Sequence, residues 1–494
     1  MMVNTMLRAN PDKRRWLALA VIVAAQFMVV LDVAIVNVAL PAIKSDLHFS
    51  QPNLQWVISA YAIFFGGFLL LGGRLGDVLG RRRVFMAGLA LFTVSSLLCG
   101  ISWSEQSLIV FRAIQGLGGA LLAPAALSIL ITTFTEGRER NLALGVWGAA
   151  SGSGGAAGVL LGGVLTSYFS WSWVFFLNIP VGVAVLAVTP FLLRDSRAGV
   201  AHRHFDVSGA ITVTSSLMLL VYAVTRTAQS GWGNPTTLGL LAAAAALLVA
   251  FIAIELRSPA PLLPLGIFRN RILAAANVIA VLVGSIMFSQ FFLLTLYMQQ
   301  VLNYSAIQTG AAFLTTTLAI VTFANVGQML VSRIGVRRVL TAGLVLNVVA
   351  LALLTRVPTN GTYLADLFPA YLIGGIGMAL TFVPMTIAGL TGVSGSDAGV
   401  ASGLINTSRQ VGGAVGLAAV SSIAAAYAGH GSISAAANAA DLTRGFQVGF
   451  DVLTGLTIVA TVLTVLFVAP AVRSARVEAP ATAKDTIDLI EEAA

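Results

Sequence analysis

Fourteen long apolar stretches constrain the fold of this chain more than any other feature of its sequence. Each has about 20 or more mainly apolar residues, the length that a helix needs to cross the hydrocarbon core of a bilayer. Backbone polar groups in lipid must bond within the segment, so the stretches are expected to be helices. They cover residues 16–40, 53–73, 83–103, 107–131, 141–165, 172–193, 206–226, 236–256, 272–300, 308–331, 338–356, 364–388, 400–427 and 446–470.

The composition leaves no room for a large soluble domain. Only 10% of the 494 residues are charged, whereas a typical soluble domain is about 25% charged, and the mean hydropathy is +0.92. Cys99 is the single cysteine, and no histidine has a second ligand at metal-site spacing. We therefore predict an all-α polytopic membrane protein with no disulfide, no metal and no bound cofactor.

Lysines and arginines are distributed unevenly between the two sides of the predicted bundle. With the N-terminus in the cytoplasm, 22 of the 28 fall in cytoplasmic segments and four in outer segments. Cytoplasmic loops collect basic residues, so both termini are expected to be cytoplasmic. The same bias explains the net charge of +9 without a nucleic-acid partner. The first apolar stretch is too long for a signal peptide, and we expect a retained helix in a bacterial cytoplasmic membrane.

Two basic, glycine-containing segments echo each other, at residues 73–83 and 327–338. Each joins two predicted spans through a short cytoplasmic turn, and internal repeats of this kind are typical of transporters. Six spans precede residue 200 and six follow residue 270. We predict an N-terminal six-helix bundle at 1–200, two inserted helices at 201–260, a C-terminal six-helix bundle at 261–470 and a cytoplasmic tail at 471–494.

The first of these segments places an acid within a basic run. Asp77 can pair with arginines or face a helix N-terminus, where the helix dipole favours an anion. Such a pair can break and re-form, so we predict a conformational latch; the alternative is a basic loop with incidental glycines. The predicted latch residues are Gly73, Asp77, Gly80, Arg81 and Arg82.

Few ionisable residues lie inside the apolar stretches, and such residues are functional candidates because a charge in lipid is costly. Asp32 lies in the first span and Arg112 in the fourth. Asp451 lies in the last span, close to its outer end. Glu255 and Arg409 are expected at cytoplasmic helix ends, in the interface.

Several motifs together resemble the fourteen-span drug:proton antiporter family of the major facilitator superfamily (MFS). They are the segment 73–83, Leu31–Pro41 in the first span, Arg112–Gly116 in the fourth, Trp171–Gly182 before the sixth and Gly403–Gly413 in the thirteenth. The resemblance implies the MFS fold, with two six-helix bundles and two additional helices. One departure is Val159, which stands where the family usually has proline.

The resemblance also implies roles for particular residues. The family's fourth-helix arginine takes part in proton transfer, so we expect Asp32 to exchange a proton and Arg112 to modulate that exchange; a static buried pair is the alternative. Small residues of the fifth helix allow close helix approach in antiporters. The corresponding residues are Gly154, Gly158, Gly162 and Gly163.

Aromatic and amide side chains inside the spans suit a pocket for apolar, often cationic molecules, through stacking and cation–π contact. Ordinary helix packing and an interfacial aromatic belt are the alternative. The candidate substrate residues are Asn37, Tyr61, Gln115, Phe288, Gln290, Phe291, Met378, Phe382 and Asn406.

The expected function is proton-coupled export of hydrophobic or cationic drugs or metabolites by a monomer that alternates access across the bilayer. The three lysines (Lys13, Lys44 and Lys484) belong to no phosphate-binding Gly-x-x-x-x-Gly-Lys loop, so an ion gradient must supply the energy unless a partner supplies ATPase activity. Metalloprotease and serine-hydrolase motifs are missing, so an enzyme is not expected. A proton-coupled uptake symporter or a narrow-substrate metabolite exporter on the same fold remains the alternative.

Overall fold

The computed structural model describes residues 11–134, 138–193, 206–259, 261–263, 265–390, 398–428 and 439–468. Within these ranges the chain is helical and contains no strand. Fourteen helices of the described residues are long and apolar enough to cross a membrane, which confirms the prediction of an all-α polytopic protein. The predicted tail at 471–494 lies outside the described residues.

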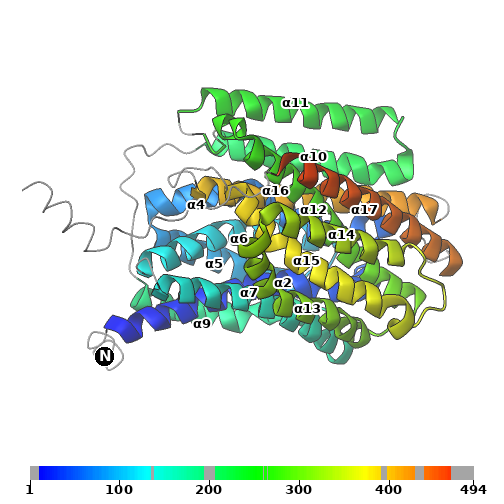
Figure 1. Cartoon of the computed structure of the whole chain (residues 1–494), viewed down its shortest axis with the longest axis horizontal. Helices are drawn as coiled ribbons and strands as arrows, with labels where there is room; N and C mark the ends of the chain where they lie inside the picture. The colour runs from blue at the N-terminus through cyan, green and yellow to red at the C-terminus, as the bar shows by residue number, and fades with distance from the viewer. Residues whose placement is uncertain are drawn as a thin grey trace, which may run out of the picture.

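The first half of the molecule comprises the helices from the N-terminus to residue 192, in blue and cyan in Figure 1. They are α2 (Pro11–Asp46), α3 (Gln51–Leu54), α4 (Trp56–Leu79), α5 (Arg81–Gly100), α6 (Glu105–Thr133), α7 (Arg138–Tyr168), α8 (Trp173–Phe176) and α9 (Asn178–Leu192). The span predicted at 172–193 is therefore divided at Leu177 into α8 and α9.

A helical hairpin and the second half of the molecule follow. The hairpin is α10 (Val207–Ser230) and α11 (Pro235–Arg257). The second half comprises η1 (Leu265–Arg269), α12 (Arg271–Leu296), η2 (Tyr297–Val301), α13 (Ala306–Ile334), α14 (Val336–Leu354), η3 (Tyr363–Leu367), α15 (Phe368–Leu390), α16 (Ala398–Tyr427) and α17 (Ala439–Phe467).

The two echoed sequence segments fold into the same kind of turn. Gly80 ends α4 and precedes α5 with φ of 110°, and Gly335 ends α13 and precedes α14 with φ of 87°. L side chains rarely adopt this conformation, so glycine is required at both positions. We call the end of the bundle that holds these two residues the glycine-turn end.

The hairpin lies along one edge of the bundle, with α11 outermost and α10 between it and the other helices (Figure 1). α10 packs on α4 of the first half and on α16 of the second half. Gln55 Nε2 donates to Thr225 Oγ1 at 2.8 Å, and Ser422 Oγ donates to the Val224 carbonyl at 3.3 Å. The hairpin therefore contacts both halves at once.

Hydrogen bonds between the two halves lie at the end opposite the glycine turns. Gln299 Nε2 donates to the Val38 carbonyl at 3.0 Å, and the Ile307 amide donates to Ser167 Oγ at 3.2 Å. On α7, Gly163 lies against α13 of the second half, whereas Gly155 lies nearer the glycine-turn end. A Cβ added at Gly155 would meet no other atom within 4 Å. Within the described ranges, no hydrogen bond links the halves at the glycine-turn end.

Candidate functional site

Asp32 lies fully buried in α2 and is surrounded by hydrogen-bond donors from other helices. Its Oδ2 accepts from Arg112 Nη1 at 2.6 Å. Its Oδ1 accepts from Gln115 Nε2 at 2.9 Å and from Asn178 Nδ2 at 2.8 Å. Both carboxylate oxygens are therefore bonded, which is the condition under which a buried charge is tolerated.

Arg112, on α6, is equally enclosed, with 2% of its surface exposed. Its Nε donates to the Val57 carbonyl at 3.0 Å, and its Nη1 also donates to Gln115 Oε1 at 2.6 Å. Its guanidinium carbon lies 4.4 Å from the centre of the Tyr61 ring, a cation–π contact. The structure thus brings together the two residues that were predicted from sequence to act as a pair.

Close backbone packing holds this ion pair in place. A Cβ at Gly116, one residue after Gln115, would collide with the Tyr61 carbonyl oxygen. A Cβ at Gly158 would lie 2.7 Å from the Leu31 carbonyl oxygen, beside Asp32. α4 and α2 therefore approach glycine faces of α6 and α7 directly.

The four glycines predicted on the fifth span pack against two different helices. Gly154, Gly158 and Gly162 face α2, where added Cβ atoms would lie 2.7–3.0 Å from backbone carbonyl oxygens. Gly163 instead faces α13 of the second half, where its Cβ would lie 2.7 Å from Ile307 Cα. The glycine face thus lies against the helix that carries Asp32 and also at the contact between the halves.

Asn178 and Ser96, for which the sequence predicted no role, complete the cluster. Asn178 Nδ2 donates to Ser96 Oγ at 3.0 Å as well as to Asp32, and Ser96 Oγ donates to the Phe175 carbonyl at 2.9 Å. The signal available in the sequence was a lone amide in the apolar segment 172–193. Its partner became evident only once α9 was packed against α2 and α5.

The predicted latch residues lie at the glycine-turn end. Arg81 Nη2 donates to Asp77 Oδ1 at 3.0 Å, so the acid pairs with an arginine one turn further along the chain. Arg82 Nη1 donates to the Leu193 carbonyl at 3.3 Å, which links the turn to the end of α9. A Cβ at Gly73 would be 3.7 Å from Pro124 Cβ, an ordinary contact.

The candidate substrate residues fall into two groups. Tyr61 and Gln115 belong to the Asp32–Arg112 cluster, and Asn37 lies on α2, where its Nδ2 donates to the Val33 carbonyl. The others lie in the second half, on α12, α15 and α16: they are Phe288, Gln290, Phe291, Met378, Phe382 and Asn406. Buried Gln290 Oε1 has no hydrogen-bond partner within the described part of the chain, so it retains an unused acceptor there.

Glu255 lies in the last turn of α11, at a helix end as predicted, whereas Arg409 does not lie at a helix end. Glu255 is only 4% exposed, because α10 and the segment after α11 cover it. Arg409 is eleven residues past the first residue of α16, about 16 Å along the axis at 1.5 Å per residue. Its Nη2 donates to Asn406 Oδ1 at 2.7 Å, and its guanidinium lies 5.6 Å from the centre of the Phe382 ring.

Known proteins resemble this chain along most of its length. Residues 22–417 match the family profile of the Major Facilitator Superfamily. The chain is 39% identical to the puromycin resistance protein pur8 of Streptomyces alboniger, over 92% of this chain and 91% of that protein. It is 40% identical to the cephamycin export protein CmcT of Amycolatopsis lactamdurans, over 81% of this chain and 83% of that protein.

Solved transporter structures share the fold at low sequence identity. The nucleoside transporter NupG superposes with a TM-score of 0.65 at 13% identity, covering 92% of this chain and 99% of that one. A bacterial homologue of the human lysosomal transporter Spinster gives 0.65 at 14% identity, covering 93% and 99%. These likenesses confirm the predicted transporter fold.

Proposed function

This chain belongs to the major facilitator superfamily, and on that basis we propose that it is a proton-coupled antiporter. It exports small hydrophobic or cationic drugs or metabolites across the cytoplasmic membrane, as a monomer with both termini in the cytoplasm. The transport direction is carried over from relatives named for antibiotic resistance and export, such as the puromycin and cephamycin proteins.

The buried Asp32–Arg112 pair is the observation that supports proton coupling most directly. Asp32 is the acid of this pair and is 0% exposed, inside a membrane-spanning bundle. The buried Asp32 carboxylate is stable only while Arg112 and its other donors remain in place. If Arg112 moves away, a proton bound to Asp32 is the smallest group that can neutralise the carboxylate in its place. Movement of α2 against α6 would therefore exchange Arg112 for a proton on Asp32.

Alternating access links this exchange to substrate movement. Six helices rock against six about a site near the midplane in this fold. The halves are hydrogen-bonded at the end opposite the glycine turns; nearer the glycine-turn end, α4 and α16 pack across the halves, with Leu70 beside Gly403. In the proposed orientation that end is cytoplasmic. The latch segment around Asp77 and Arg81 is proposed to stabilise the outward-facing state by closing the cytoplasmic side; the Asp77–Arg81 pair itself is also formed in this structure.

Transport assays with a charge-neutralising variant test the proposal. We would measure efflux of a fluorescent lipophilic cation and of puromycin with an imposed pH gradient, for wild type and Asp32→Asn. Loss of proton-driven efflux is expected while the variant still inserts, because the Val57 carbonyl, Gln115 Oε1 and two aromatic rings still accompany Arg112.

Asp451→Asn is the matched control, since Asp451 is an exposed acid on α17 with no ion-pair partner among the residues that the structure describes. It should retain efflux. Full proton-driven efflux by Asp32→Asn would exclude Asp32 from the coupling path. Failure of wild type to extrude either probe would favour a narrow-substrate exporter or an uptake symporter.

A further inference from the structure

Two buried acids meet at the base of the helical hairpin, at the glycine-turn end. Asp206 is the N-cap residue of α10, and Glu255 lies in the last turn of α11. Each has only 4% of its surface exposed. Neither acid belongs to the Asp32 cluster or to the latch, so the proposed function leaves them unexplained.

Each carboxyl group has one oxygen that is bonded and one that is not. Asp206 Oδ1 accepts from the Gly209 amide at 2.7 Å and from Ser208 Oγ at 2.9 Å. Glu255 Oε2 accepts from the Leu263 amide at 3.0 Å. The other two oxygens, Asp206 Oδ2 and Glu255 Oε1, are buried and have no hydrogen-bond partner among the residues that the structure describes.

The two unpartnered oxygens converge on one point. Both would lie 2.9 Å from a Cβ placed on Gly209, so they are at most twice that distance, 5.8 Å, apart. Gly209 is what permits this approach, since any side chain there would meet both acids. Two ionised carboxylates in this position would repel each other with no donor to compensate them, which is unfavourable in a buried site.

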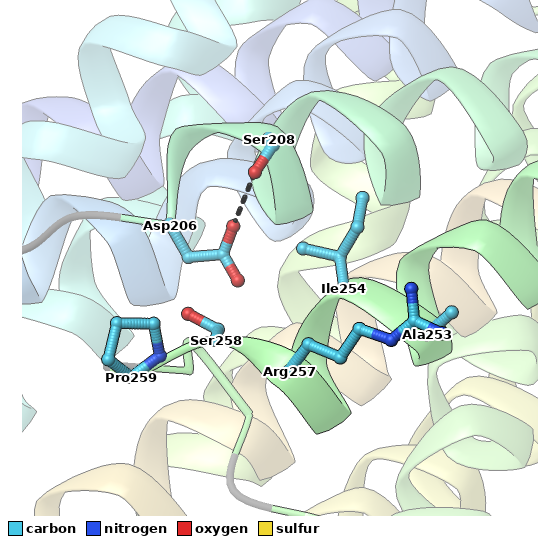
Figure 2. A pocket seen from close by; sticks show the side chains of 7 residues that line it. All are labelled: Asp206, Ser208, Ala253, Ile254, Arg257, Ser258 and Pro259. Atoms are coloured by element: carbon cyan, nitrogen blue, oxygen red, sulfur yellow. Dashed lines mark hydrogen bonds between the residues drawn. The ribbon is translucent and has the colours of Figure 1, made fainter.

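No compensating cation is supplied by the described part of the protein. Arg257 lines a pocket of about 410 Å³ together with Asp206 and Ser208. Figure 2 shows the side chains that line this pocket. However, the arginine makes no ion pair with either acid. A divalent metal would need more ligands, and no third His, Cys, Asp or Glu side chain of the described residues joins the pair.

We propose that Asp206 and Glu255 hold one proton between them, directly or through one bridging water. A single proton turns one unpartnered oxygen into a donor and the other into its acceptor, and it leaves one negative charge instead of two. The proton links the first turn of α10 to the last turn of α11. Because α10 bonds to both halves through Thr225 and Val224, this site is connected to the helices that move during transport.

Infrared spectroscopy and thermal unfolding of the purified full-length protein test this site independently of transport. Wild type is expected to show a protonated-carboxyl band near neutral pH that Asp32→Asn keeps. Glu255→Gln and Asp206→Asn should each lose the band. Asn is as good an N-cap as Asp, and the side-chain amide introduced by Glu255→Gln would donate to Asp206 permanently, so both variants are expected to fold.

The pH dependence has a definite sign. The folded pair binds a proton that separate, unfolded carboxyl groups release near neutral pH, so stability from this site is present at lower pH and lost as pH rises. The unfolding temperature of wild type should therefore fall towards alkaline pH, and that of Glu255→Gln should fall less.

Two results would overturn the proposal. One is a carboxyl band and pH slope in Glu255→Gln equal to those of wild type. The other is a wild type without the band, combined with strong destabilisation by Arg257→Gln at neutral pH, which would identify Arg257 as the counter-ion.

Discussion

The two halves of the molecule each contain an arginine deep inside the bundle, and the two arginines have opposite surroundings. Arg112 in the first half is bonded to a carboxylate, a carbonyl and an amide. Arg409 in the second half has an amide and an aromatic ring for partners, and within the described residues it has no carboxylate within ion-pair distance. One positive charge is neutralised inside the protein, and the other is not.

This difference separates two tasks. A neutralised pair can change state only by exchanging its counter-ion, which suits coupling to a proton. A cation with neutral partners retains its field, which suits discrimination among charged substrates. We therefore expect the first half to control energy coupling and the second half to control selectivity, and the following predictions test that division.

The largest effect is expected when the pair in the first half is broken. Arg112→Gln leaves Asp32 buried without its cation, which costs about 3–5 kcal/mol of stability. Thermal unfolding of the purified variant in detergent, compared with wild type, measures this loss of stability.

The double variant Asp32→Asn, Arg112→Gln is the control for this experiment. It removes both charges, so it should regain most of the stability while proton-driven transport stays absent. A double variant that is as unstable as Arg112→Gln would show that shape, rather than charge, maintains this site.

A steric change beside the pair should have the next largest effect. The added methyl group of Gly158→Ala would lie 2.7 Å from the Leu31 carbonyl oxygen. Overpacking of this kind costs about 1–3 kcal/mol, and the shift of α2 should also reduce proton-driven efflux. Gly155→Ala on the same helix meets nothing within 4 Å and should be neutral; equal effects of both variants would contradict this packing argument.

Removal of the unpaired cation should change selectivity more than stability. For Arg409→Gln we expect a stability change of at most about 1 kcal/mol, because no carboxylate loses its partner. The KM for a lipophilic cation should fall, roughly two- to tenfold, since a repulsive charge is gone. Arg409→Lys is the matched variant that keeps the charge and should keep the KM; an unchanged KM in Arg409→Gln would remove Arg409 from the substrate path.

The smallest effect on stability is expected at the latch. The Asp77–Arg81 pair spans four residues on a partly exposed surface, and such pairs contribute about 0.3–0.5 kcal/mol. Asp77→Asn should therefore leave the unfolding temperature almost unchanged and yet slow transport by destabilising the outward-facing state. Normal transport rates in this variant would exclude a latch function.

Much of the fold followed from sequence because lipid permits few solutions. Fourteen apolar stretches had to become helices, and the two glycine-containing turns at Gly80 and Gly335 needed a backbone conformation that other residues rarely adopt. Boundaries were less well determined. The last helix begins at Ala439 rather than residue 446, since hydropathy marks where lipid contact begins and not where a helix begins.

The candidate site was only partly accessible from sequence. Asp32 and Arg112 stood out because charge is rare in an apolar span. Asn178 did not, since an amide in a helix is ambiguous until its neighbours are known. Glu255 was placed at an interface by its position near a helix end, whereas α10 and Leu263 cover it.

The number and type of the helices, the likeness of the two halves and the identity of the buried charges could therefore be derived without coordinates. Hydropathy, charge bias and glycine conformation act locally along the chain, which is why sequence is enough for them. Which charges meet was settled by folding in three dimensions. Asp32 is far from Arg112 in the sequence, as Asp206 is from Glu255. Long-range helix packing supplies Asp32 with hydrogen-bond donors. It leaves one oxygen of Asp206 and one of Glu255 without a donor among the described residues.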